Sequence, residues 1–235
     1  MDRRWMIVDA ASNHFVTQRE QHRLCLIHVA LSGDALTLTA PTLEPLQVSQ
    51  QQSHNGDKRQ VKVWQDWVEG VDCGDLAAQW LSDFLGSAVR LVFMADDCHR
   101  LVDQHYAGNA ERVSFADGFP LLLVSESSLD NFNQHLQSPI DASRFRPNIV
   151  VSGCTAFAED QWQKIQIGPL SFELVKPCSR CVIPSIDPKT GGKQVAVSQA
   201  LAKHRRRDGA VYFGQNLLAK QHGILSVGDR LTVLS

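Results

Sequence analysis

Short stretches in which apolar and polar residues alternate, separated by turn sequences, constrain the fold of this chain more than any other feature. Residues 35–40 and 60–64 alternate with a period of two, as expected of strands that bury one face. Turn-forming residues interrupt the pattern, for example at residues 32–34. Many short strands and few helices indicate a β-barrel with helical insertions. Further strands are predicted at residues 5–8, 15–17, 46–48, 89–94, 121–124, 147–152, 165–168 and 172–175, with a hairpin at 224–234.

Helices are expected at only two places. Residues 75–84 carry apolar side chains at helical spacing, with Asp75 able to cap the start and Gly86 able to close the end. A second helix is expected at residues 127–132, beginning with a serine cap.

Three polar segments are interpreted as loops. Residues 50–57 are expected to form an exposed hairpin loop, and residues 95–110 a loop between two domains. Residues 203–208, which include three consecutive arginines, are expected to form a basic loop. This loop would either dock an acidic electron-transfer partner or be a solvated run of charge, and the second interpretation is favoured.

The charge balance excludes some classes of partner. The chain has 235 residues, with 23 Lys and Arg against 25 Asp and Glu, so its net charge is −2. This balance provides no general attraction to nucleic acid or to acidic membranes. No apolar run approaches the roughly 20 residues needed to span a bilayer. Six cysteines are too sparse for a disulfide scaffold, so we expect a reducing, cytoplasmic setting.

A pair of cysteines stands out as the candidate reactive group. Cys178 and Cys181 lie three residues apart, with Arg180 between them. Thiolates bind soft metals or act as nucleophiles, and a nearby guanidinium favours the thiolate. Spacing alone leaves open the alternative of two buried, inert thiols. A structural zinc site with Cys73 or with Cys98 and His99 is disfavoured, because those residues are distant in sequence and no second Cys-x-x-Cys exists.

The order of short motifs resembles a known family, the MOSC domain (the C-terminal domain of molybdenum cofactor sulfurases). The resemblance is strongest to the branch that contains the mitochondrial amidoxime-reducing component and its bacterial relatives. N-terminal motifs also resemble the β-barrel domain that precedes MOSC in that branch. The matching segments are residues 2–8, 17–19, 72–75, 77–80, 145–153, 158–162, 167–168, 176–181, 187–188, 190–191, 213–216 and 227–229.

The resemblance implies a mainly β fold with α insertions. A MOSC β-barrel domain is expected at residues 96–235, preceded at 1–95 by a smaller α+β, β-barrel-like domain. In the family, a strand with a Pro-Val-Lys-Ser segment precedes the Asp-Arg motif. This chain begins after that point, so we expect the first domain to lack one strand and to leave an open edge. The segment 213–216 is expected to be a turn.

The resemblance also implies a molybdenum cofactor, molybdopterin, with Cys181 as the metal ligand and catalytic thiolate. Cys178 would be a packing neighbour. Arg146 and Asn148 match positions near the pterin, Arg3 matches a contact to the cofactor phosphate, and Arg19 would support the same site. Arg180 and Lys176 would keep the thiolate charged and face the anionic cofactor.

The implied activity is reduction of N-hydroxylated compounds such as amidoximes, hydroxylamines and N-hydroxylated base analogues. Electrons would come from a separate flavin or iron–sulfur protein, because the chain carries no cluster-binding cysteines of its own. Two alternatives remain open at this stage. The chain would be a non-catalytic carrier of the cofactor or of sulfur on Cys181, or an inactive truncated relative.

Overall fold

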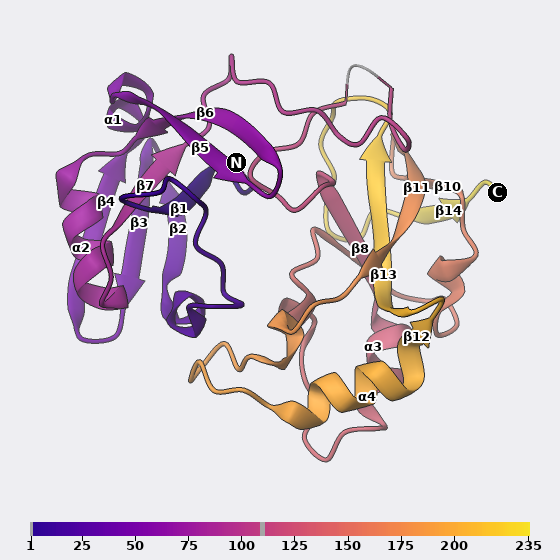
Figure 1. The fold of residues 1–235 in the computed structure, drawn as a ribbon. Helices are drawn as coiled ribbons and strands as arrows, with labels where there is room; N and C mark the ends of the chain where they lie inside the picture. Colours follow the sequence, from indigo (N-terminus) through magenta and orange to yellow (C-terminus); the bar gives the residue numbers. More distant parts are fainter. Residues whose placement is uncertain (1, 109–110) are drawn as a thin grey trace. The chain divides into compact units, whose positions relative to one another are not determined.

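The computed structural model describes residues 2–108 and 111–235 and divides them into two compact units (Figure 1). Unit 1 comprises Met1–Leu101, Arg112–Asp117 and Asp187–Gly192. Unit 2 comprises Val102–Glu111, Gly118–Ile186 and Lys193–Ser235. Each unit has its own sheet structure and its own buried clusters of apolar side chains.

Unit 1 contains a four-stranded antiparallel sheet that nearly closes on itself. Its order is β1 (Trp5–Asp9), β7 (Val89–Phe93), β6 (Asp66–Asp72) and β5 (Lys58–Val63). Backbone hydrogen bonds from Phe15 to Lys62 (3.0 Å) and from Val16 to Ile7 (2.8 Å) bridge the two edge strands, β5 and β1. Residues 13–16 therefore complete the curvature of a barrel-like sheet. Only an isolated bridge at Phe15 remains of the strand expected at 15–17.

A second sheet and one long helix complete the core of unit 1. The sheet comprises β2 (His28–Ser32), β3 (Ala35–Ala40) and β4 (Leu43–Ser49), preceded by the 3-10 helix η1 (His22–Leu26). Helix α2 (Asp75–Leu85) buries Leu81 and Phe84 in the same apolar cluster as Leu36 and Leu38 of β3. Gly86 ends the helix in the left-handed conformation, as predicted, whereas Gly74 occupies the N-cap position that was expected for Asp75.

Asp72 fixes the start of this helix to two strands. Its carboxylate accepts hydrogen bonds from Arg59 of β5 (3.1 Å), from Arg90 of β7 (2.9 Å) and from the Gly74 backbone (2.9 Å). Burial raises the pKa of Asp72, but the hydrogen bond from Arg90, the one from Gly74 and the charges of both arginines outweigh it, so the pKa is lowered. The carboxylate therefore stays charged and links β5, β6, β7 and α2.

The loop expected at 50–57 is wrong, because Gln50–Asn55 forms the short helix α1. Local hydrogen bonds and one tertiary contact, which its polar composition did not indicate, hold this helix. Ser53 is fully buried, donates a hydrogen bond to the Ser49 carbonyl (3.1 Å), and accepts one from the Trp5 indole (3.4 Å). The Ser49 hydroxyl also accepts a bond from the Gln51 backbone (3.1 Å). These contacts order a segment whose local sequence favours a loop.

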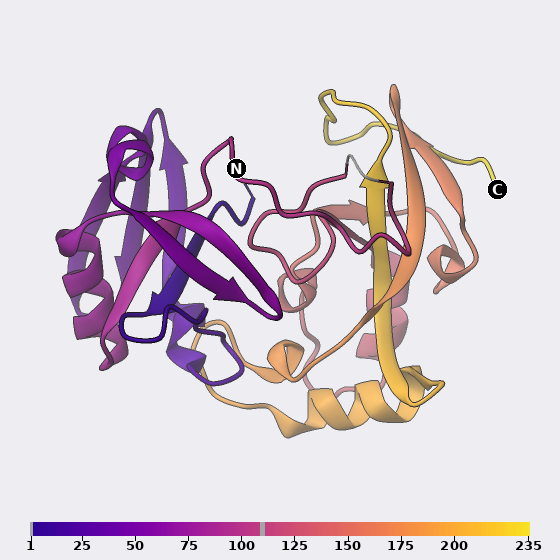
Figure 2. The same ribbon diagram turned by 45° about the horizontal axis from the view of Figure 1, so that its top comes forward.

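Unit 2 is built around one extended sheet (Figure 2). Its path runs β14 (Leu231–Val233), β10 (Lys164–Ile167), β11 (Leu170–Ser179), β13 (Ala210–Ala219), β8 (Leu121–Ser125) and β9 (Ile149–Val151), with β12 (Arg206–Arg207) paired to β13. The strands predicted at 165–168 and 172–175 are confirmed as β10 and β11, which pair in antiparallel register. The helices are α3 (Glu126–Asn133), α4 (Val195–Arg205) and the 3-10 turns η2 (Ala142–Phe145), η3 (Ala158–Asp160) and η4 (Ile183–Ser185).

An aromatic cluster joins the sheet of unit 2 to its helices. The rings of Phe145 and Phe213 stack with centroids 4.1 Å apart, and Phe132 of α3 meets Phe213 edge-on at 5.7 Å. Ser125 caps α3 by accepting a hydrogen bond from the Ser128 backbone, so the predicted serine cap lies two residues earlier than expected. Glu159 is buried among the hydroxyls of Ser125 (3.0 Å) and Ser128 (2.7 Å).

Three expectations for unit 2 are wrong. The supposed basic loop is the last turn of α4 followed by β12, and cations in a last helical turn are stabilised by the helix dipole. The hairpin expected at 224–234 does not form, because β14 pairs with the distant β10. The expected turn at 213–216 lies within β13, where Gly214 adopts a positive φ of 79° and the strand continues to pair with β8 and β11.

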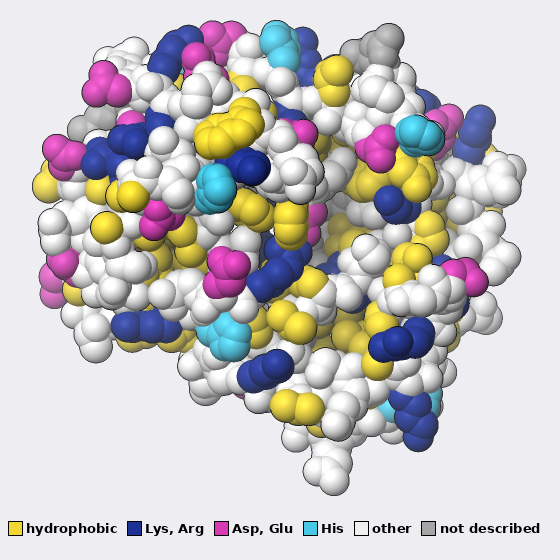
Figure 3. Space-filling view, viewed as in Figure 1, with side chains coloured by type: hydrophobic (Ala, Val, Ile, Leu, Met, Phe, Trp, Pro, Cys, Tyr) yellow, Lys and Arg dark blue, Asp and Glu magenta, His cyan; other side chains and the backbone are white. Residues whose placement is uncertain are grey.

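The architecture is thus mostly sheet with a few helices, as predicted. None of the helices among residues 2–108 and 111–235 is both long and apolar enough to cross a lipid bilayer. On the face drawn in Figure 3, Lys and Arg side chains are interspersed with Asp and Glu side chains, in keeping with the small net charge.

Candidate functional site

Strand β11 positions the two cysteines differently. Pro177, Cys178 and Ser179 are the last residues of β11, and the Arg180 backbone N–H donates to the Val211 carbonyl (2.7 Å) just beyond the strand. Cys178 is half-buried and packs against the aromatic cluster of unit 2. Cys181 is exposed. The second thiol is therefore the more accessible of the two to a ligand or a reagent from solution.

Arg180 is held in place by its two terminal nitrogens. Nη1 donates to the Cys178 sulfur (3.0 Å) and Nη2 to the Phe145 carbonyl (3.0 Å), while the guanidinium lies 5.3 Å above the Phe145 ring. The remaining nitrogen, Nε, is buried and has no hydrogen-bond partner among the described residues. A buried guanidinium N–H without a partner is costly, so this donor is a position where a bound acceptor would be stabilised.

Arg146 and Asn148 follow η2, whose last residue, Phe145, accepts the hydrogen bond from Arg180. Arg146 ends η2 in the left-handed conformation (φ 56°) and is exposed. The Asn148 side-chain oxygen accepts a hydrogen bond from the Leu122 backbone (2.9 Å), and its own backbone N–H donates to the Leu122 carbonyl (2.9 Å). Asn148 therefore has a structural role at the start of β9, and its exposed side keeps it available to a ligand.

Arg144 is a residue that sequence reasoning missed. It is buried, and its terminal nitrogens donate to the Pro184 carbonyl (3.3 Å) and to the Gln194 side chain (2.7 Å). These bonds tie η2 to η4, the turn that directly follows Cys181 and Val182. The sequence does show a second arginine two residues before Arg146. The role of Arg144, however, depends on contacts with residues that are distant in sequence.

The two site residues expected near the N-terminus belong to unit 1. Arg3 has a positive φ of 51°, pairs with Asp2, and its carbonyl accepts a hydrogen bond from Phe115 (3.1 Å). Arg19 pairs with Asp117 (3.3 Å) and stacks over the Trp64 ring at 4.5 Å. Both arginines thus contact the segment Arg112–Asp117, whereas Arg146, Asn148, Arg180 and Cys181 belong to unit 2.

Several other charged groups are engaged elsewhere. The Lys176 ammonium lies 4.6 Å from the Tyr106 ring centroid, so its described contact is not with a thiol. Arg205, from the basic run, pairs with the buried Asp160 (2.6 Å), which also accepts a bond from Arg207 (3.3 Å). Asp187 shapes the following turn by accepting hydrogen bonds from the backbone N–H groups of Lys189 (2.8 Å) and Gly191 (2.7 Å).

The described residues contain no group of three or more His, Cys, Asp or Glu side chains able to hold a metal ion. Cys73, which was considered for zinc, is buried, and burial raises its pKa to about 11. A metal at Cys181 would therefore have to bring most of its own ligands, as a metal bound within an organic cofactor does.

Comparison with known proteins identifies the family. The model of the MOSC domain matches residues 110–232, and that of the MOSC N-terminal beta barrel domain matches residues 1–88. The mitochondrial amidoxime-reducing component 1 of Homo sapiens is 33% identical over 99% of this chain and 73% of its own length. The mitochondrial amidoxime reducing component 2 of Rattus norvegicus is 34% identical over 97% of this chain and 72% of its own length.

A solution structure of a Bordetella bronchiseptica protein is 27% identical and covers 40% of this chain and 74% of that one, at a TM-score of 0.36. Both halves of the chain are thus matched by family models, and the relatives match nearly all of it. The chain belongs to the MOSC family and carries a MOSC N-terminal β-barrel domain ahead of its MOSC domain.

Proposed function

We propose that this chain is a molybdenum-cofactor-dependent reductase of N-hydroxylated compounds such as amidoximes, hydroxylamines and N-hydroxylated base analogues. One observation carries the proposal. The chain is about one-third identical, over nearly its full length, to proteins named amidoxime-reducing components, and its single exposed member of the cysteine pair is Cys181. Residues 1–95 and 96–235 would be the two functional domains, which the ranges of the two family models support.

The residues of unit 2 fit a molybdopterin cofactor. The buried Arg180 Nε is a donor that lacks an acceptor, and an anionic, oxygen-rich cofactor would supply one. The lone exposed thiol suits a metal that arrives with sulfur ligands, because a thiolate completes such a soft donor set. Arg146 and Asn148 are exposed, follow the Phe145 that Arg180 contacts, and would hold the pterin. Arg3 would bind the cofactor phosphate, with Arg19 in support.

The chain's own contribution to the reaction would be binding and positioning. Cys181 would bind the metal as a thiolate, and the bonds from Arg144 to the Pro184 carbonyl and to Gln194 would keep the loop after Cys181 in one conformation. The bound cofactor would supply the redox chemistry, in which two electrons and two protons cleave the N–O bond and release water. A separate flavin or iron–sulfur protein would deliver the electrons, and the free state of all six thiols supports a cytoplasmic setting.

The decisive experiment measures molybdenum by elemental mass spectrometry in protein from cells that make the cofactor. We expect near-stoichiometric molybdenum in the wild type and in Cys178→Ser, and its loss in Cys181→Ser. Cys178→Ser is the matched control, because it changes the other thiol of the same pair. Equal molybdenum in all three proteins would mean that Cys181 is not the metal ligand. No molybdenum in any of them would mean that the chain does not bind the cofactor.

Turnover separates the reductase from a carrier. The loaded wild type should reduce an amidoxime with an artificial electron donor, and the product amidine should appear in proportion to the donor consumed. A carrier role is favoured by the exposure of Cys181, which would leave a persulfide accessible to an acceptor protein. Sulfur that cyanide releases from Cys181, together with no amidoxime reduction, would establish the carrier function instead.

A further inference from the structure

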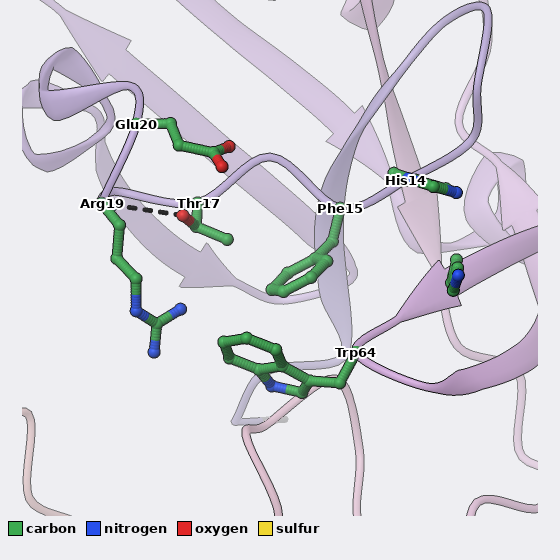
Figure 4. Close-up of a pocket in the computed structure, with 7 residues that line it drawn as sticks. His14, Phe15, Thr17, Arg19, Glu20 and Trp64 are labelled. Carbon is green, nitrogen blue, oxygen red and sulfur yellow. Dashed lines mark hydrogen bonds between the residues drawn. The ribbon is translucent and has the colours of Figure 1, made fainter. Parts of the chain in front are cut away.

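We propose that a cavity in unit 1 is a binding site for a single-ring aromatic carboxylate. The cavity has a volume of about 260 Å3 and is lined by His14, Phe15, Thr17, Arg19, Glu20, Lys62 and Trp64 (Figure 4). The proposal is argued from these lining residues, and it shares only Arg19 with the proposed cofactor site. Three features determine the class of ligand, namely the aromatic walls, the charge and the size.

Two aromatic rings form one wall of the cavity. Phe15 and Trp64 lie 4.9 Å apart at an interplanar angle of 63°, and in Figure 4 both rings turn toward the space that the Arg19 side chain enters. Phe15 is anchored because its backbone donates to the Lys62 carbonyl (3.0 Å) within the nearly closed sheet. A planar ligand ring can therefore add an edge or face contact to rings that are already held in place.

Trp64 occupies an unusual position. It lies in the turn between β5 and β6 with a positive φ of 57°, and it remains 39% exposed. A bulky residue in the left-handed region is disfavoured, and a large exposed indole gains little from burial. Such strain commonly occurs at binding sites, where the surrounding structure maintains a conformation that the isolated residue would avoid.

The charge of the lining favours an anion. Arg19 and Lys62 supply two cations against the single carboxylate of Glu20. The Arg19 guanidinium stacks 4.5 Å above the Trp64 ring and pairs with Asp117 at 3.3 Å, where Asp117 is 75% exposed. An exposed ion pair of this kind is weak, so a ligand carboxylate can take the place of Asp117. The hydroxyl of Thr17 accepts the Arg19 backbone N–H (3.2 Å) and holds the turn that presents this side chain.

The volume limits the ligand to one ring. Drug-sized ligands occupy pockets of roughly 300–1,000 Å3, and this cavity lies just below that range. Benzoate combines one planar ring with one negative charge and is therefore the probe of choice. Benzamide keeps the ring without the charge, and cyclohexanecarboxylate keeps the charge without the aromatic face.

The test is a titration of the full chain with sodium benzoate, followed by the indole N–H signals in a two-dimensional 1H–15N NMR spectrum. The chain has 5 tryptophans, so these signals are few, and Trp64→Leu and Trp80→Leu assign two of them. We expect a saturable shift of the Trp64 signal and none of the Trp80 signal. Benzamide and cyclohexanecarboxylate should each bind several-fold more weakly than benzoate.

Matched variants distinguish the cavity from the surrounding surface. Trp64→Leu should weaken benzoate binding, followed at the Phe15 amide, by about tenfold. Trp80→Leu, which changes a tryptophan of α2 whose indole donates to the Glu44 carbonyl (2.7 Å) outside the cavity, should not. Lys62→Gln should weaken it several-fold, and Lys58→Gln on the same strand should not. The proposal is overturned if benzoate gives no saturable shift, if both tryptophan variants act alike, or if cyclohexanecarboxylate binds as well as benzoate.

Discussion

At the residue scale, the six cysteines show how one residue type acquires different chemistry from its surroundings. Cys181 is exposed on the loop after β11. Cys73 is buried and, among the described residues, lies next to no charged group that would favour its thiolate. Burial raises the pKa of Cys73 to about 11, and it also raises the pKa values of Cys25 and Cys98. The sequence led us to expect that Cys181 is the reactive thiol, but it gave no measure of this contrast in exposure and pKa.

The contrast predicts an order of alkylation. With iodoacetamide at pH 8, Cys181 should react first, and Cys73 should react at least about a hundredfold more slowly, because a thiol with a raised pKa carries little thiolate at that pH. Raising the pH toward 10 should accelerate Cys73 and leave the order intact. Trypsin cleaves after Arg180, so Cys178 and Cys181 fall in separate peptides and mass spectrometry can quantify each. Equal rates for Cys73 and Cys181 in the folded protein would contradict the assigned environments.

Arginine contacts mark the limit of prediction at this scale. Local motifs identified Arg146 and Arg180 as candidate site residues. They gave no indication of which groups Arg180 contacts. Its nitrogens meet Phe145 and Cys178, and the first of these lies 35 residues away in sequence. Arg144 is the same case, since its acceptors Pro184 and Gln194 are 40 and 50 residues away. One sequence without a fold cannot rank such contacts.

At the element scale, prediction succeeded where the pattern is local. The alternation of residues 35–40 became β3 with the same bounds, and the helical periodicity of 75–84 became α2 with one residue added. Prediction failed where an element is held in place by contacts with residues that are distant in sequence. Helix α4 starts without a side-chain cap and has a weakly amphipathic sequence, and its position is set by packing against η4 and β13. The Asp208-Gly209 pair, typical of two-residue hairpin turns, does join β12 to β13 and was an overlooked signal.

The close approach of strand β8 to β13 indicates that position 214 requires glycine. A Cβ atom there would lie 2.6 Å from the Leu123 carbonyl oxygen and 2.9 Å from a Val124 methyl group, in a backbone conformation with φ of 79°. Gly214→Ala should therefore lower the free energy of unfolding by about 2–4 kcal/mol, because it combines backbone strain with overpacking. Urea denaturation followed by circular dichroism measures this loss.

Gly209 provides the control for this substitution. It has the same φ of 79°, but a Cβ atom at this position would meet nothing within 4 Å. Gly209→Ala should therefore lower the free energy of unfolding by about 1 kcal/mol, which is the effect of the backbone strain alone. If both variants lose the same stability, the close approach of β8 to Gly214 is not what requires glycine there.

At the scale of the whole molecule, unit 1 is assembled from three separate parts of the chain. The segment Asp187–Gly192 begins only six residues after Cys181 yet belongs to unit 1. There the Asp187 carbonyl accepts a hydrogen bond from the Cys25 thiol (3.4 Å). From the sequence this segment was recognisable only as a turn. Its six residues carry no apolar pattern, so nothing local indicates the distant surface on which they lie.

Cofactor binding should therefore register as a change in the stability of the whole chain. A ligand that binds only the folded protein raises its stability by about 2.7 kcal/mol at one hundred times the dissociation constant. For a chain of this length such a gain raises the melting temperature by roughly 5–10 °C. Wild-type protein from cells that make the cofactor should melt that much higher, in calorimetry, than the same protein from cells that cannot.

Two variants, Cys181→Ser and Gly209→Ala, test whether this difference in melting temperature depends on the Cys181 thiolate. Cys181→Ser should show little or no dependence on the expression host, because it lacks the proposed metal ligand. Gly209→Ala should keep the full dependence although its stability is lower in both hosts, since its Cβ meets nothing within 4 Å. A difference of the same size in Cys181→Ser would mean that the arginines and Asn148 retain the cofactor without the thiolate. No difference in the wild type would mean that the chain does not bind it.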